Sequence, residues 1–237
     1  MNIFGFIAVL SWLALGWCIV FCLIHFFRLI KLGKVKDLSQ KSGNIAKAVI
    51  YSNTVSMLPN QKESAYKHLP TYTAGIIFHL GSFLSLLLFV LSLFDCFDKI
   101  TSWLMFDGWW LLACMTCFLL LSFLCGFSLL LKRAFSKKLR PLSNFDDYFS
   151  NAIVTLFQFF SFSLLLIYTI VGKTFWLGLF DLYLCNVLFY GCYISAILLL
   201  LYLPFGKLKH AIYYFAARYH LGFFYGWRNT WPPHKKK

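Results

Sequence analysis

Long apolar stretches alternate with polar segments along this chain. The apolar stretches occupy about residues 3–30, 71–94, 103–131, 150–171 and 182–203. Each reaches the roughly 20 residues that a helix needs to cross the hydrocarbon core of a bilayer. The first exceeds the apolar part of a cleaved signal peptide, which is about 7–15 residues long. The pattern predicts an all-α integral membrane protein, a five-helix transmembrane bundle that forms a single domain over residues 1–237.

The polar segments between these stretches carry weaker helix signals. Within the long polar segment 32–67, the run 45–51 predicts one or two interfacial amphipathic turns. Ser143 or Asn144 is placed to cap the fourth long helix. The tail, residues 207–237, is basic and aromatic and predicts a helix that lies on the membrane surface and ends at Gly226.

Composition and charge add an orientation to this picture. The chain is 60% hydrophobic and 13% charged, with a net charge of +14. Twenty of its 22 lysines and arginines lie in residues 28–67, 132–140 and 207–237, and the other two are Lys99 and Lys173. The positive-inside rule then predicts a multi-pass protein of the cell inner (cytoplasmic) membrane, with its N-terminus outside and its C-terminus in the cytoplasm. Nucleic acid is a poor partner, because no folded soluble module is present to bind it.

Two histidines stand out because each follows a glycine by four residues. His79 follows Gly75 inside the second apolar stretch, and His210 follows Gly206 just past the fifth. Residues four apart on a helix share a face, so each glycine leaves a shallow notch beside an imidazole. A flat macrocycle needs such a notch, and two imidazoles can ligate a haem iron axially. We therefore expect a haem, with His79 and His210 as ligands and Gly75 and Gly206 beside it.

Other interpretations of these histidines stay open. Each imidazole could instead hydrogen-bond a neighbouring helix or lie among headgroups. His68 is an alternative ligand. If each helix is straight and rises 1.5 Å per residue, the depth of His68 in the membrane matches that of His210 better than the depth of His79 does. Three cations near His210 could bind haem propionates, or could follow only from the positive-inside bias: Lys207, Lys209 and Arg218.

Two local motifs carry a resemblance to a known family. Phe78-His-Leu-Gly81 and Pro204-Phe-Gly-Lys-Leu-Lys-His210 resemble the haem-ligand motifs of the gamma subunit of respiratory nitrate reductases. That family also includes membrane subunits of heterodisulfide-reductase-like complexes. The resemblance implies five helices and a haem near the cytoplasmic side that His79 and His210 ligate. Where the family holds a second haem, this chain has Phe89 and Cys192, so we expect a single haem.

The resemblance also implies a function. The chain is expected to be a membrane cytochrome b subunit that passes electrons between menaquinone, or another quinone, and a cytoplasmic iron–sulfur partner. It would be an electron-transfer subunit without catalytic residues of its own. Gln158 and Asn151 are candidates for a bond to a quinone carbonyl, or for a helix–helix hydrogen bond. The alternative function is a haem-free membrane anchor for a cytoplasmic redox subunit.

Overall fold

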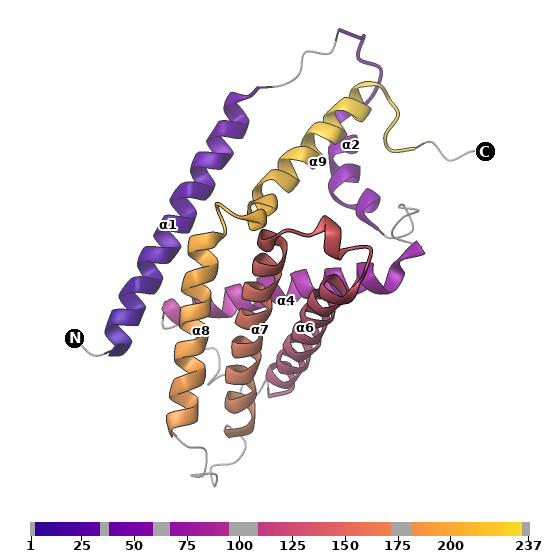
Figure 1. The fold of residues 1–237 in the computed structure, drawn as a ribbon. Helices are drawn as coiled ribbons and strands as arrows, with labels where there is room; N and C mark the ends of the chain where they lie inside the picture. Colours follow the sequence, from indigo (N-terminus) through magenta and orange to yellow (C-terminus); the bar gives the residue numbers. More distant parts are fainter. Residues whose placement is uncertain (1–2, 34–37, 59–66, 95–108, 172–181, 234–237) are drawn as a thin grey trace. The chain divides into compact units, whose positions relative to one another are not determined.

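The described residues of the protein are all helical or irregular (Figure 1). A computed structural model describes residues 3–33, 38–58, 67–94, 109–171 and 182–233, and no strand occurs among them. The α-helices are α1 (Ile3–Lys31), α2 (Ile45–Asn53), α4 (Leu69–Leu93), α6 (Trp109–Phe135), α7 (Phe145–Val171), α8 (Leu182–Tyr202) and α9 (His210–Trp227). Short 3-10 turns cover Val55–Met57, Arg140–Leu142 and Lys207–Lys209.

Five of the described helices, α1, α4, α6, α7 and α8, are long and apolar enough to cross a membrane. They confirm the predicted stretches, although residues 103–108 of the third lie outside the described chain. Helix α7 begins at Phe145, five residues before the predicted span. Its start is set by a reciprocal cap, in which Asp147 N–H donates to Asn144 Oδ1 and Asn144 N–H donates to Asp147 Oδ2.

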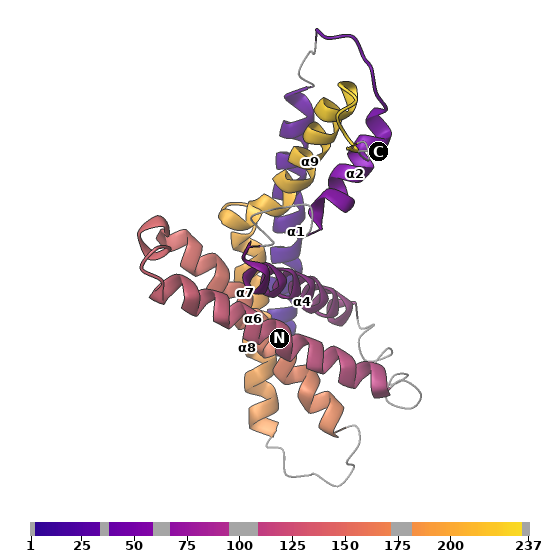
Figure 2. The same ribbon diagram turned by 90° about the vertical axis from the view of Figure 1, so that its right-hand side faces the viewer.

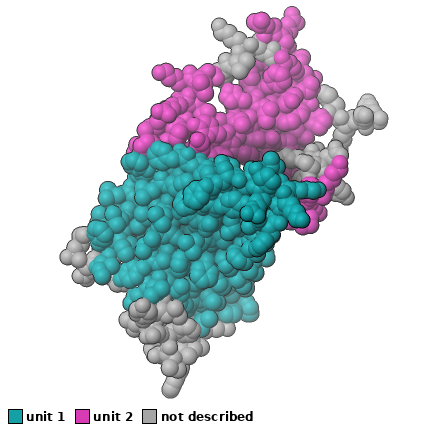
Figure 3. Space-filling view, in the orientation of Figure 1, with its two compact units in different colours: residues 1–18, 73–207 teal, residues 19–72, 208–237 magenta. Residues whose placement is uncertain are grey.

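The chain divides into two compact units (Figure 3). Unit 1 consists of residues 1–18 and 73–207, and unit 2 of residues 19–72 and 208–237. Helices α1 and α4 each contribute residues to both units.

The core of unit 1 lies where α4, α6 and α7 meet. Leu112, Leu119 and Leu165 are almost completely buried, and partly buried side chains of α4, α6 and α7 pack against them. Helix α7 packs against both α6 and α8. Because these helices are apolar all round, their outward faces also carry exposed leucine and phenylalanine side chains, as expected for helices that face lipid.

Helix α4 runs across α6, α7 and α8 in Figure 1. The close approach is made at Gly81, where an added Cβ atom would overlap the Ser122 side chain of α6. Ser122 Oγ donates to the carbonyl oxygen of Ile77 at 3.1 Å, and Ser92 Oγ on α4 lies 3.0 Å from the Tyr193 hydroxyl on α8. Small residues at helix crossings are typical of membrane bundles, because they let two backbones approach.

Unit 2 contains α2 and α9, which are far apart in the sequence but pack antiparallel and lie side by side in both Figures 1 and 2. We call this pair of helices the hairpin. Gly222 and Gly226 of α9 face α2, and a Cβ atom on either would overlap Val49 or Ala48. The polar segment after α1 and the tail therefore form one folded module. The predicted turns at 45–51 and the predicted tail helix are both present as helices, but they pack against each other.

Polar groups hold the two ends of this hairpin. At one end, Ser42 N–H donates to the carbonyl oxygen of Trp227 at 2.9 Å, and Trp227 Nε1 donates to that of Ser39 at 2.8 Å. Toward the other end, the Arg218 guanidinium donates to the Ser52 carbonyl and to Ser56 Oγ. These long-range bonds join residues more than 160 positions apart in the chain.

Candidate functional site

His79 lies on α4, with its imidazole exposed on the helix surface. Its Nδ1 atom lies 2.6 Å from the carbonyl oxygen of Gly75, one turn earlier. Because a carbonyl oxygen can only accept, Nδ1 carries the proton and donates it. In this tautomer the lone pair of the ring is on Nε2, which is the form in which histidine binds a metal.

The surface beside Gly75 is open. Among the described residues, a Cβ atom on Gly75 would meet nothing within 4 Å beyond its own stretch of helix. The Phe78 ring contacts the His79 ring edge-on, with centroids 5.7 Å apart. Among the described residues, the surface of α4 beside His79 is therefore open at Gly75.

The surroundings of His210 differ from those of His79. Helix α8 ends at Tyr202, residues 207–209 form a 3-10 turn, and α9 begins at His210. Gly206 and His210 therefore do not share one helical face, because the chain leaves the helix around Pro204, which lacks an N–H group. Gly206 is buried, and a Cβ atom on it would overlap the ring of Tyr202. Tyr202, and not an open notch, occupies the space beside Gly206.

His68 lies just before α4 and is exposed. Its carbonyl oxygen accepts the N–H groups of Thr71 and Tyr72 at 3.0 Å, so its backbone takes part in the start of the helix. His68 and His210 both belong to unit 2, whereas His79 belongs to unit 1.

Two of the three cations predicted to surround His210 have partners within the protein. Lys207 Nζ lies 2.5 Å from Asp147 Oδ1. Arg218 donates to the Ser52 carbonyl and to Ser56 Oγ. The third, Lys209, is exposed. Much of the positive charge near His210 thus serves to join segments of the fold.

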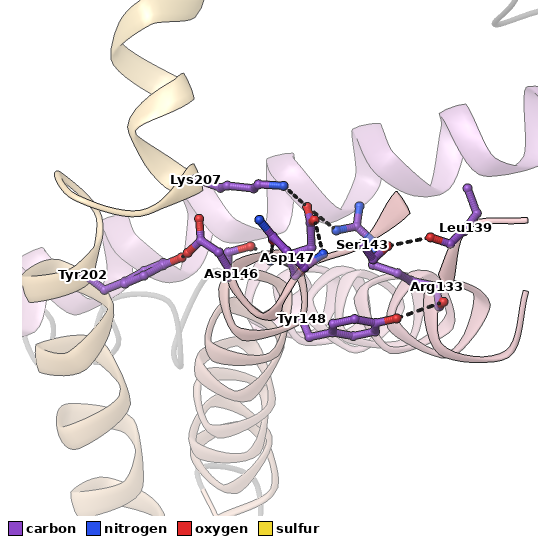
Figure 4. Close-up of polar contacts among 10 residues, drawn as sticks. Arg133, Leu139, Ser143, Asp146, Asp147, Tyr148, Tyr202 and Lys207 are labelled. Atoms are coloured by element: carbon purple, nitrogen blue, oxygen red, sulfur yellow. Dashed lines mark hydrogen bonds and ion pairs between the residues drawn. The ribbon is translucent and has the colours of Figure 1, made fainter. Parts of the chain in front are cut away.

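A polar cluster at the start of α7 was not anticipated as a unit from the sequence (Figure 4). Asp147 is only 8% exposed and accepts from both Lys207 and Arg133, the latter at 2.7 Å. Its neighbour Asp146 accepts from the Tyr202 hydroxyl. Two adjacent carboxylates at the positive end of α7 therefore bind the end of α6, the end of α8 and the turn that follows α8.

Gln158 on α7 forms part of a buried polar layer. It is 0% exposed, and its Nε2 donates to the Phe78 carbonyl and to Ser82 Oγ of α4, both at 2.8 Å. The amide therefore forms the helix–helix bond that was one of its two expected roles. Asn151, the second quinone candidate, accepts from Thr155 Oγ1 at 3.0 Å.

Comparison with known proteins does not add a family to this picture. No protein-family model, no curated protein and no solved structure matches the chain. Within the described residues, no group of three or more His, Cys, Asp or Glu side chains could hold a metal ion. What the fold defines is a class: an all-α protein whose five apolar helices make it a multi-pass membrane protein.

Proposed function

We propose that this protein is a membrane cytochrome b subunit of the cell inner (cytoplasmic) membrane, with its N-terminus outside. In this proposal His79 ligates a single haem b, with His210 as the second ligand. The protein would exchange electrons with menaquinone or another quinone and with a cytoplasmic iron–sulfur subunit. Bound between two histidines, a haem b would supply one-electron transfer, and the terminal reaction would belong to the partner.

The observation that carries the proposal is the hydrogen bond from His79 Nδ1 to the Gly75 carbonyl. Metal-ligating histidines almost always donate their second ring N–H to a carbonyl, a carboxylate or water, which fixes the tautomer and the plane of the ring. The open surface at Gly75 supports the same interpretation. An ionisable side chain on an apolar helix is also costly in lipid, which favours a functional role.

The second candidate function is a haem-free membrane anchor. Tyr202 fills the space beside Gly206, and Asp147 binds Lys207, so both groups have a structural role that needs no cofactor. The bond from His79 to Gly75 would satisfy the N–H donor of an imidazole in lipid. An anchor would hold a soluble redox subunit through its basic loops and tail.

A spectrum separates these two functions. The protein is expressed with haem supplied, dissolved in detergent and examined as a reduced-minus-oxidised difference spectrum. A cytochrome shows a b-type signal that His79→Ala abolishes, while His220→Ala on the exposed side of α9 leaves it intact. Absence of the signal from the unaltered protein would reject the cytochrome and favour the anchor.

The second ligand is decided by two further variants. His210→Ala is expected to abolish the low-spin b-type signal, and His68→Ala is expected to keep it. The reverse result would assign the ligand role to His68. Monodisperse elution of each variant in size-exclusion chromatography controls for misfolding.

A further inference from the structure

Helix α9 presents two different faces. Arg218, Gly222 and Gly226, spaced four residues apart, form the face that packs on α2. A second row of residues at helical spacing runs along another face, and we name it the outer stripe. It consists of Tyr213, Ala217, Leu221, Phe224 and Arg228.

The outer stripe is apolar along its length and basic at its end. Ala217, Leu221, Phe224 and Arg228 are exposed, and Phe224 alone keeps 45% of its surface accessible. The Arg228 guanidinium lies 3.7 Å from the centre of the Phe224 ring. A helix with exposed apolar side chains and flanking cations is typical of segments that lie at a membrane surface.

One contact joins the outer stripe to α1, a helix long enough to cross a membrane. The Tyr213 hydroxyl lies 2.9 Å from His25 Nδ1 on α1, and the two rings are also in contact. Helix α1 has 29 residues and is about 43 Å long at 1.5 Å per residue, so its C-terminal part reaches beyond a hydrocarbon core of about 30 Å. Around His25 it still exposes apolar side chains, with Phe27 62% exposed. The stripe therefore begins beside the C-terminal part of α1.

The described part of unit 2 carries charges of one sign. Its described residues include no aspartate or glutamate and carry eight basic side chains: Arg28, Lys31, Lys41, Lys47, Lys67, Lys209, Arg218 and Arg228. Lys41 borders a hollow of about 690 Å³ between α2 and α9, together with Asn44, Ile50 and Tyr219. Ile50 at its edge is 64% exposed. A cation next to exposed apolar groups suits a phosphate headgroup with the start of its acyl chains.

We propose that the hairpin of α2 and α9 lies in the headgroup layer and binds anionic phospholipid, with Lys41 and Lys47 contacting headgroups and the outer stripe facing the acyl chains. The positive charge complements an anionic surface, and each lysine near such a surface contributes to binding. The contact of Tyr213 with α1 favours lipid over a soluble partner. This inference does not use His79 or His210 and stands whether or not the protein binds haem.

Lipid titration of the full-length protein tests the charge component. The protein is purified in neutral detergent, and its unfolding temperature is followed as phosphatidylglycerol or phosphatidylcholine is added. We expect stabilisation by phosphatidylglycerol only. Lys41→Gln/Lys47→Gln should weaken the apparent affinity by about fivefold per lysine removed. The matched control Lys137→Gln/Lys138→Gln, which removes two exposed lysines of unit 1, should keep it.

If both double variants lose the same affinity for phosphatidylglycerol, the proposal is overturned. The binding would then depend on the overall charge of the protein and not on Lys41 and Lys47. A photo-reactive benzoylphenylalanine in place of Phe224 tests the position of the stripe in native membranes. A phospholipid adduct, identified by its mass, is the expected product. A cross-link to another protein, or no adduct, would overturn the assignment of the outer stripe to lipid.

Discussion

Lys207 Nζ lies 2.5 Å from Asp147 Oδ1 and so joins the turn after α8 to the first turn of α7. Arg133, at the end of α6, binds the same oxygen at 2.7 Å. One carboxylate therefore connects three segments that are distant in sequence. This connection ends three residues before His210, so the fold itself restrains the segment that leads to the candidate ligand.

Replacing Asp147 with asparagine should destabilise unit 1. The change leaves Arg133 and Lys207 without their carboxylate, but both cations are partly exposed, so we expect a loss of about 1–2 kcal/mol. Thermal unfolding in detergent measures it. Lys209→Gln, two residues after Lys207 and exposed, is the control and should be neutral. An unchanged unfolding temperature for Asp147→Asn would show that the cluster does not stabilise the fold.

Gly81 on α4 and Gly16 on α1 should respond differently to an added methyl group. Gly81→Ala inserts a methyl group onto Ser122 and should cost about 1–3 kcal/mol through overpacking. Gly16→Ala on α1 is the matched control in the same unit, because nothing lies within 4 Å of its Cβ position among the described residues. It should be neutral or stabilising by about 0.5–1 kcal/mol. Unfolding temperatures of the two variants provide the comparison, and equal values would contradict the close crossing at Gly81.

The variant Gly75→Leu should distinguish an effect on haem binding from an effect on the stability of the fold. The Cβ position at Gly75 is open among the described residues, so we expect a leucine there to change the unfolding free energy of haem-free protein by less than about 1 kcal/mol. If a macrocycle occupies that surface, haem content measured by the pyridine haemochrome assay should fall strongly. Retention of full haem content would place the cofactor elsewhere.

The hairpin of α2 and α9 should depend on Gly222. Its Cβ position overlaps the backbone of Val49, which has no flexible end that can move aside. Gly222→Val should separate the two helices and increase hydrogen exchange throughout residues 45–53. Ala217→Val, on the outer stripe of the same helix, should leave that exchange unchanged. Slow exchange in both variants would show that the hairpin tolerates a wider spacing.

Arg218 should act on stability and leave haem content unchanged. Its guanidinium donates to the Ser52 carbonyl and Ser56 Oγ, so Arg218→Gln should destabilise the hairpin by about 1.5–3 kcal/mol. Hydrogen exchange of residues 45–57 reports that loss, and the b-type spectrum should keep its intensity. A loss of haem with an intact hairpin would instead support the propionate role predicted from the sequence.

The five apolar helices were predictable from the sequence, because hydrophobic length is a local property and about 20 apolar residues specify a span without knowledge of neighbours. The cap of α7 at Asn144 was predictable for the same reason, since its bonds reach only three residues. The proximity of His79 to Gly75 was predictable too, because residues four apart share a helical face.

Tertiary structure decided what lies between distant segments. The partners of Lys207 and Arg218 and the pairing of α2 with α9 all depend on how the chain folds back. A lysine beside a histidine has the same local pattern whether it faces a cofactor or a carboxylate 60 residues away. Only packing distinguishes these cases, because long-range contacts are selected by shape and charge complementarity that no single segment contains.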